Sequence, residues 1–190
     1  MKQFLKNAIE YIGELVRVIL ISLAIILPVR YFLIQPFYVK GASMEPNFYD
    51  HEYLIIDEIS YRFREPARGD IIVFHYPLDP SEYFIKRIIG LPNETVEIKG
   101  GKIYITNDEQ KEGTALSEPY LASVSTFGDK KVKLGSDEYF VLGDNRSSSL
   151  DSRHFGPLSR IYIVGRAWLR GWPLERIERF VTPTYNINIK

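Results

Sequence analysis

The sequence contains no cysteine among its 190 residues. This absence excludes disulfides, thiol nucleophiles and cysteine-ligated metals, and it leaves the redox compartment open. The chain also lacks an excess of charge of either sign, because 24 lysines and arginines balance 24 aspartates and glutamates. A domain that binds nucleic acid usually carries a basic excess. We therefore expect no nucleic-acid partner.

Histidine is scarce as well. The three histidines, His51, His75 and His154, have a spacing that matches no zinc motif. We expect neither a metal nor another cofactor. Aromatic residues, by contrast, are abundant: 13 tyrosines and 11 phenylalanines form a composition that favours β-structure.

The N-terminal segment differs from the rest in its apolar pattern. Residues 1–14 place apolar side chains at helical spacing between charged ones, which predicts an amphipathic helix. The run that follows is apolar apart from one serine and two arginines, and it predicts a transmembrane anchor over 15–35. Its uncharged centre, 18–29, covers only about 18 Å. A bilayer interior of roughly 30 Å is therefore spanned only if Arg17 and Arg30 extend to its two surfaces.

Two other interpretations of this segment stay open. The same residues fit a peripheral or buried helix. They fit a cleaved signal peptide less well, because no small-x-small cleavage pattern follows the apolar run. The lysines and arginines on either side of the run favour a cytoplasmic N-terminus only weakly.

From residue 36 onward the apolar pattern changes to a period of two, which is typical of strands. Turn residues such as Gly100 and Gly101 separate the apolar runs. Because no segment of helical period lies between them, we predict a mainly β, antiparallel domain over 36–181. The predicted strands are 53–57, 70–75, 83–89, 95–98, 102–105, 138–142 and 161–169.

Two parts of the chain lack this strand pattern. Residues 107–136 are polar and weakly patterned, and we expect them to form an excursion or small lobe between two core strands. Residues 182–190 form a C-terminal tail that we expect to be frayed.

The first segment able to carry chemistry is the turn at 41–46, which follows the apolar run. Small residues precede Ser43 and leave its hydroxyl open to a substrate, while Pro46 fixes the turn that follows. A serine in such a turn is most often only a turn residue, so this signal is weak alone.

The second segment is the predicted strand at 83–89. Side chains alternate along a strand, so Lys86 and Arg87 point to opposite faces and one of them is expected to point inward. Burial lowers the pKa of a lysine, whereas arginine effectively keeps its proton. Lys86 can therefore act as a general base and Arg87 cannot. The alternative is an edge strand on which both charges are solvated.

The third segment is the polar loop at 143–153, which follows an apolar strand. Its side chains can hydrogen-bond one another and the backbone. Asp151 and Arg153 are two residues apart and can form an ion pair. Such a loop is either a structured functional loop or an ordinary solvent-facing one.

Together these segments resemble the bacterial type I signal peptidases, a family of Ser-Lys serine proteases. Four patches match in order: 43–46, 68–74, 86–90 and 143–153. The resemblance implies a β-rich catalytic domain on the extracytoplasmic side of the cell membrane, attached by a single span. It also implies that the chain removes signal peptides from exported preproteins through an acyl-enzyme, without a cofactor. The partners implied are those signal peptides and the lipid bilayer.

The resemblance assigns roles to individual residues. Ser43 matches the nucleophile and Lys86 the general base, while Ser149 matches a serine that hydrogen-bonds the lysine amine. Asp151 and Arg153 match a structural ion pair. Further supporting residues in the polar loop are Gly143, Asp144, Asn145 and Arg146. The walls of the substrate pockets match Val39, Met44, Phe84 and Ile85.

One position departs from the pattern of some members of that family. Two residues before the nucleophile they carry a serine or threonine whose hydroxyl helps to bind the oxyanion, and here that position is Gly41. We therefore expect backbone N–H groups, chiefly that of Ser43, to form the oxyanion hole.

Two other functions stay open at this point. The first is a self-cleaving Ser-Lys protease of the repressor type, which the N-terminal apolar segment disfavours. The second is an inactive, membrane-tethered β-domain that only binds exported peptides. Such a domain would be expected to have lost Ser43 or Lys86, and both are present.

Overall fold

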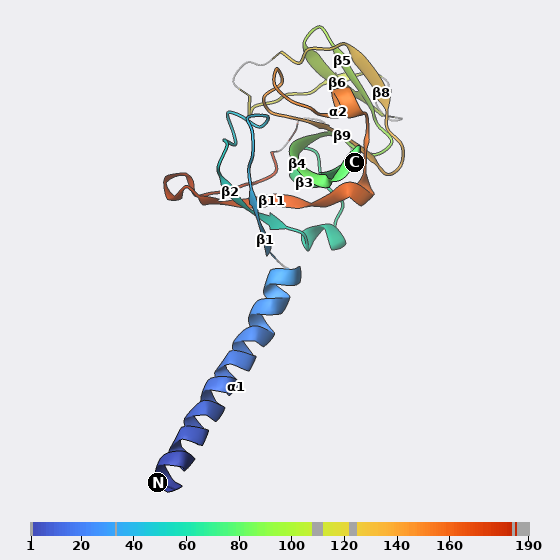
Figure 1. Cartoon of the computed structure of the whole chain (residues 1–190). Helices are drawn as coiled ribbons and strands as arrows, with labels where there is room; N and C mark the ends of the chain where they lie inside the picture. Colours follow the sequence, from blue (N-terminus) through green and yellow to red (C-terminus); the bar gives the residue numbers. More distant parts are fainter. Residues whose placement is uncertain (1, 33, 108–111, 122–124, 184, 186–190) are drawn as a thin grey trace.

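The computed structural model describes residues 2–32, 34–107, 112–121, 125–183 and 185. It shows a long N-terminal helix, α1, followed by a β-rich domain built from two antiparallel sheets (Figure 1). The helix projects away from this domain, so the two sheets alone form the packed core.

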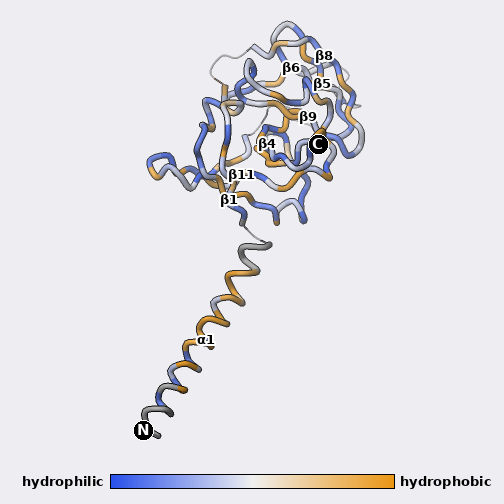
Figure 2. The backbone as a smooth tube through the Cα atoms, viewed as in Figure 1, coloured by the Kyte–Doolittle hydropathy of each residue, from blue (hydrophilic) through white to orange (hydrophobic). Residues whose placement is uncertain are grey.

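Helix α1 (Lys2–Phe32) is one continuous helix, so the two segments distinguished in the sequence form a single element. At 1.5 Å per residue it is about 46 Å long. Its large apolar side chains between Ile9 and Leu27 are exposed. Much of this stretch is orange in Figure 2 because its residues are hydrophobic. Among the residues that the structure describes, no helix is both long and apolar enough to cross a membrane. The span predicted over 15–35 is therefore not shown by the structure.

The large sheet confirms the predicted mainly β, antiparallel fold. Every strand pair in it is antiparallel. In spatial order its strands are β1 (Ile34–Tyr38), β2 (Tyr53–Asp57), β11 (Ile163–Trp172), β3 (Ile71–Tyr76), β4 (Asp79–Gly90), β9 (Glu138–Leu142) and β10 (Leu158–Ser159), with β12 (Glu178–Arg179) paired to β11. The short helices are α2 (Ser152–Phe155), η1 (Ser60–Arg62), η2 (Arg160–Tyr162) and η3 (Leu174–Arg176).

The small sheet consists of β7 (Thr114–Ala115), β6 (Lys102–Thr106), β5 (Thr95–Lys99) and β8 (Lys130–Lys133), in that order. It contains two strands that the sequence analysis placed in the main fold, so the lobe begins before the predicted 107–136. Apolar side chains on its inner face, such as Val96 and Ile103, pack against Phe140 and Leu142 of the large sheet. This packing makes the lobe part of the same domain.

Strand β4 lies inside the large sheet, between β3 and β9. In the β3–β4 register, Ile72 is opposite Lys86 and Ile71 is opposite Arg87. Because both edges of β4 are paired and both faces are covered, the residues from Lys86 to Gly90 are all buried. The fold therefore places a lysine and an arginine inside the domain.

The described part of the C-terminal tail contacts the core. The Thr182 hydroxyl donates to Asp70, and the ring of Tyr185 lies against Gly69. A Cβ on Gly69 would come within 2.6 Å of that ring, so only glycine leaves the space that the ring fills. Residues 182, 183 and 185 are thus packed rather than frayed, and the rest of the tail lies outside the described residues.

Candidate active site

Two buried side chains anchor the loop that carries Ser43. Met44 and Phe48 are 1% and 0% exposed and pack in the core beside Val39 and Leu54. The Phe48 N–H donates to Met44 O (2.9 Å), which closes the turn predicted around Pro46. Ser43 sits next to this anchor and is half-buried. The apolar residues of the motif therefore fix the backbone from which the hydroxyl projects.

Hydrogen bonds hold the same loop from two sides. The Gly41 N–H donates to Asp50 Oδ1 (2.9 Å), and Gly41 has φ +91°, a conformation that side chains with a Cβ rarely adopt. On the other side, Asn145 donates its side-chain amide to Ala42 O (3.0 Å) and its backbone N–H to Ser43 O (3.0 Å). The nucleophile loop is thus held between residues about 100 positions apart in the sequence.

The structure brings Ser43 and Lys86 together. Lys86 Nζ lies 2.8 Å from Ser43 Oγ, and the same amine donates to Ile85 O at 2.8 Å. Lys86 is only 3% exposed, and burial lowers the pKa of its amine to about 8, although the charges of Asp151 and Asp144 act in the opposite direction. At pH 7 about a tenth of such amines are neutral and able to accept a proton.

Arg87 is buried on the opposite face of β4 and pairs with Asp144. Its Nε and Nη2 donate to the two carboxylate oxygens at 2.8 and 2.6 Å, a bidentate geometry. The guanidinium also lies 3.8 Å from the centre of the Tyr120 ring. The alternative of a solvated edge strand is therefore wrong, and neither basic residue of the motif points into solvent.

The loop at 143–153 packs tightly against the nucleophile. A Cβ on Gly143 would lie 2.2 Å from Ser149 Oγ and 2.5 Å from Ser43 O, so no other residue fits there without a shift. The Gly143 N–H donates to Asp151 Oδ2 (3.1 Å). Glycine at this position lets the loop approach Ser43.

Ion pairs stabilise this loop. Arg153 Nε donates to Asp151 Oδ1 at 2.9 Å, and Arg146 Nη1 donates to Glu118 Oε2 at 2.8 Å. Burial raises the pKa of Asp151, but the hydrogen bonds and charge of Arg153, together with the hydrogen bond from the Gly143 N–H, hold that pKa below its usual value. Within the part of the chain that the structure describes, no three His, Asp or Glu side chains are grouped so as to hold a metal ion.

Ser149 lies beside the Ser43–Lys86 pair, but it does not form the predicted hydrogen bond to the lysine amine. Its Oγ is buried near Gly143 and makes no hydrogen bond to Lys86. The amine uses Ile85 O and Ser43 Oγ instead. The orienting role of Ser149 stays a prediction.

A pocket of about 560 Å³ opens next to the Ser43–Lys86 pair. Three of the four residues predicted to form its walls, Val39, Phe84 and Ile85, do line it. Met44 does not, because it is buried in the core beneath the loop. The other apolar and aromatic residues of the lining are Phe37, Tyr38, Leu54, Val73, Tyr83 and Leu150.

Two residues that the sequence analysis did not single out complete the site. Asp50 accepts the Gly41 N–H, and Asn47 Nδ2 donates to Asp144 Oδ2 (2.7 Å). Neither contact follows from a period or a motif, because each depends on how the loop folds back. The only signal is that two polar residues follow Pro46 closely.

Comparison with known proteins gives a consistent picture. The family model described as "Signal peptidase, peptidase S26" matches residues 12–172. A probable signal peptidase I-2 from a Synechocystis strain is 38% identical over 86% of this chain and 75% of its own length. A signal peptidase I from Leptolyngbya laminosa is 39% identical over 90% of this chain and 84% of its own length. A crystal structure of a signal peptidase I from Enterococcus faecalis also matches, with 35% sequence identity and a TM-score of 0.47. The match covers 54% of this chain and 97% of the chain in that structure. The family model and the two relatives from Synechocystis and Leptolyngbya laminosa show that the chain belongs to the signal peptidase family, peptidase S26.

Proposed function

We propose that this protein removes signal peptides from exported preproteins as a serine endopeptidase, with Ser43 as nucleophile and Lys86 as general base. Membership of the signal peptidase family supports the activity. One observation carries the assignment of residues. A buried amine with a pKa of about 8 lies 2.8 Å from a half-buried serine hydroxyl, beside an apolar pocket.

The reaction follows from this geometry. Neutral Lys86 accepts the proton of Ser43 as Oγ attacks the scissile carbonyl. The resulting ammonium then gives its proton to the leaving amine, which leaves an acyl-enzyme on Ser43. Water attacks this ester with Lys86 again as base, and the signal peptide departs with a free carboxylate. The Ser43 N–H faces the oxyanion in this scheme, and Gly41 adds no side-chain donor.

The remaining residues of the loop at 143–153 support the pair. Asn145 holds the nucleophile loop, and the Arg87–Asp144 ion pair fixes the strand end from which that loop starts. Asp151 is held by Arg153 and lies close enough to Lys86 to affect its pKa. We assign Ser149 to orienting the lysine amine once substrate is bound.

The pocket supports a preference for small residues before the cut. Val39 and Leu54 are buried and Phe84 and Ile85 half-buried, so these walls are themselves packed in the domain. A large substrate side chain would have to displace them, at a cost of roughly 1–3 kcal/mol. Met44 contributes from behind by supporting the loop rather than by touching substrate.

We also propose that α1 attaches the protein to the cell membrane as a single-pass anchor, with the β-rich domain on the extracytoplasmic side. The support is the row of exposed apolar side chains from Ile9 to Leu27, which no part of the domain covers. Carbonate washing of membranes that contain the full chain tests attachment. Protease added to intact cells should digest the domain, and protection of the domain would overturn the proposed orientation.

The experiment that tests the activity uses the full chain in detergent with a purified exported preprotein. Mass spectrometry of the products should place the cut after a small-x-small motif. Ser43→Ala should abolish the cut, while Ser148→Ala, at an exposed serine of the polar loop, should leave it intact. Cleavage of the enzyme itself instead of the preprotein would favour the repressor-type protease. Binding without cleavage would favour the inactive peptide-binding domain.

A further inference from the structure

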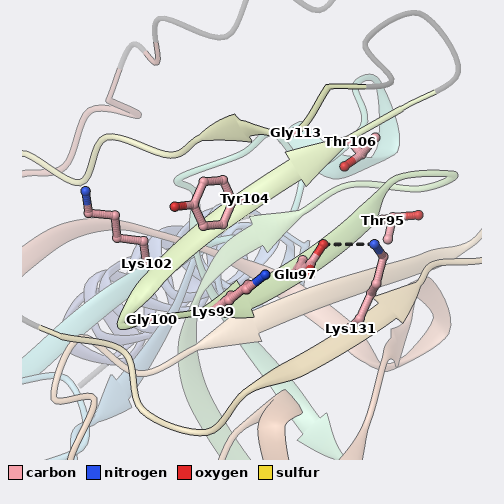
Figure 3. Close-up of a pocket in the computed structure, with 9 residues that line it drawn as sticks. All are labelled: Thr95, Glu97, Lys99, Gly100, Lys102, Tyr104, Thr106, Gly113 and Lys131. Atoms are coloured by element: carbon pink, nitrogen blue, oxygen red, sulfur yellow. Dashed lines mark hydrogen bonds and ion pairs between the residues drawn. The ribbon is translucent and has the colours of Figure 1, made fainter.

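The outer face of the small sheet is an exposed, lysine-rich surface. Figure 3 shows its side chains above β5, β6 and β8, around a hollow of about 650 Å³. We call it the lysine face. It consists of Thr95, Glu97, Lys99, Lys102, Tyr104 and Lys131. These residues alternate with the apolar side chains that bury the inner face, so they are free to meet a ligand.

The charges on this face are unbalanced, although those of the whole chain cancel. Lys131 is paired with Glu97, which lies opposite it in the β5–β8 register, at 2.8 Å. Lys99 and Lys102 lie directly opposite each other at the end of the β5–β6 hairpin. Like charges in such a pair repel and destabilise the sheet. Among the described residues neither lysine forms an ion pair, although the charge of Lys99 also acts on Glu97, so the three lysines of the face outnumber its one carboxylate.

An aromatic ring lies next to the two lysines. Tyr104 is two residues from Lys102 along β6 and therefore points to the same side of the sheet. The neighbours of Tyr104 are small. Ala115 of β7 lies opposite it in the β6–β7 register, and Gly113, just before β7, lies near the Tyr104 Cβ. Small neighbours leave the ring open as a platform for an apolar or backbone group. The face thus offers two ammonium groups and an aromatic surface side by side.

We propose that the lysine face binds an acidic, extended segment of the mature part of the preprotein while its signal peptide is cut. This inference rests on the proposed function. Charge complementarity selects an acidic ligand, since three lysines face one glutamate. The position of the face indicates which molecule carries the acidic segment. It lies at the end of the molecule opposite α1 (Figure 1), and the mature part of a membrane-held preprotein leads away from the membrane.

Binding here is expected to be modest and sensitive to salt. The two lysines are exposed, so each ion pair with a carboxylate contributes little. Together they should change the affinity about three- to tenfold at low ionic strength. The effect on catalysis is expected in KM, because the face is not part of the Ser43–Lys86 pair.

Fluorescence anisotropy tests binding without any need for cleavage. The probe is a fluorescein-labelled glutamate-rich peptide, with its glutamine counterpart as the neutral control, added to the full chain in detergent. Wild-type protein should bind only the acidic peptide. Combined Lys99→Gln and Lys102→Gln should weaken binding about three- to tenfold. Arg62→Gln with Arg179→Gln removes the same charge from the large-sheet side and should change nothing. Equal binding by both double variants would overturn the proposal, as would binding of the neutral peptide.

Cleavage assays then test the source of the ligand. A preprotein with an acidic segment after the cut should show a raised KM and an unchanged kcat in the double lysine variant. A short peptide substrate without that segment should be cut equally by both forms. Failure of wild-type protein to cut either substrate would count against the proposed function and leave the binding result standing. Tighter binding of polyphosphate than of the acidic peptide would assign the face to an anionic polymer and overturn the assignment to preprotein.

Discussion

Replacing Lys86 with methionine separates the cost of burying the amine from its use in catalysis. Methionine keeps a long apolar stem and removes the ionisable group. Burial lowers the pKa of Lys86 from 10.5 to about 8. The folded chain therefore binds fewer protons than the unfolded chain between these two values, and stability from this group rises with pH across that window.

The magnitude follows from the size of this pKa shift. A fall from 10.5 to about 8 destabilises the folded protein by about 3 kcal/mol when the pH lies below both values. The methionine variant avoids this cost but loses the bonds to Ser43 Oγ and Ile85 O, at about 1 kcal/mol each. We expect a net gain of about 1 kcal/mol at pH 7, or roughly 2–4 °C in melting temperature. At pH 10 the cost in wild type falls to about 1 kcal/mol, so the variant should be the less stable form.

The assay is thermal unfolding of both forms in the same detergent at pH 7 and pH 10. Lys99→Met provides a control, because Lys99 is exposed and its substitution should give no such change of sign. The methionine variant should also fail to cut a preprotein. A melting temperature several degrees below wild type at both pH values would show that Lys86 carries no burial cost, and would remove the physical reason for treating it as the base.

Three further predictions concern the surroundings of the pair. Ser149→Ala should lower kcat about tenfold or more while the melting temperature stays near that of wild type, as steady-state kinetics and calorimetry would show; unchanged kcat would make Ser149 an ordinary loop residue. Asp50→Ala should lower kcat because the Gly41 N–H loses its acceptor, whereas Asp50→Asn keeps an acceptor oxygen and should retain most activity. Preproteins with leucine or phenylalanine before the cut should show kcat/KM about 10- to 100-fold lower than the alanine form, measured by product formation; efficient cutting of them would contradict the packed pocket walls.

The sequence predicted those parts of the fold in which burial alternates regularly. The expected strands at 53–57 and 102–105 match β2 and β6, because the buried side chains of each strand alternate onto one covered face. Strand β1 was not predicted, since its apolar residues continue the pattern of the preceding helix and it contains Pro36. Strand β8, with three lysines in four residues, carries too little apolar alternation to be recognised.

The residue types of the candidate site could be predicted from the sequence, but the burial of its side chains could not. Strand β4 lies inside the sheet, so Lys86 and Arg87 are both buried. The alternation of side chains along the strand had predicted that only one of the two would be buried. Met44 was expected at the pocket wall, but a side chain next to the nucleophile can equally point into the core, and here it does. The contact of Asp50 with Gly41 depends on the path of the loop, which local sequence does not specify.

The central claim is that neutral Lys86 activates Ser43, and the pH dependence of kcat/KM tests it most directly. The assay uses the full chain in detergent with one preprotein, over a range from about pH 6 to pH 10. If neutral Lys86 is the base, kcat/KM rises with pH through a midpoint near 8, the pKa of the buried amine, and Ser43→Ala is inactive throughout. A rate that does not depend on pH across this range, or cleavage that persists without the Ser43 hydroxyl, would contradict it.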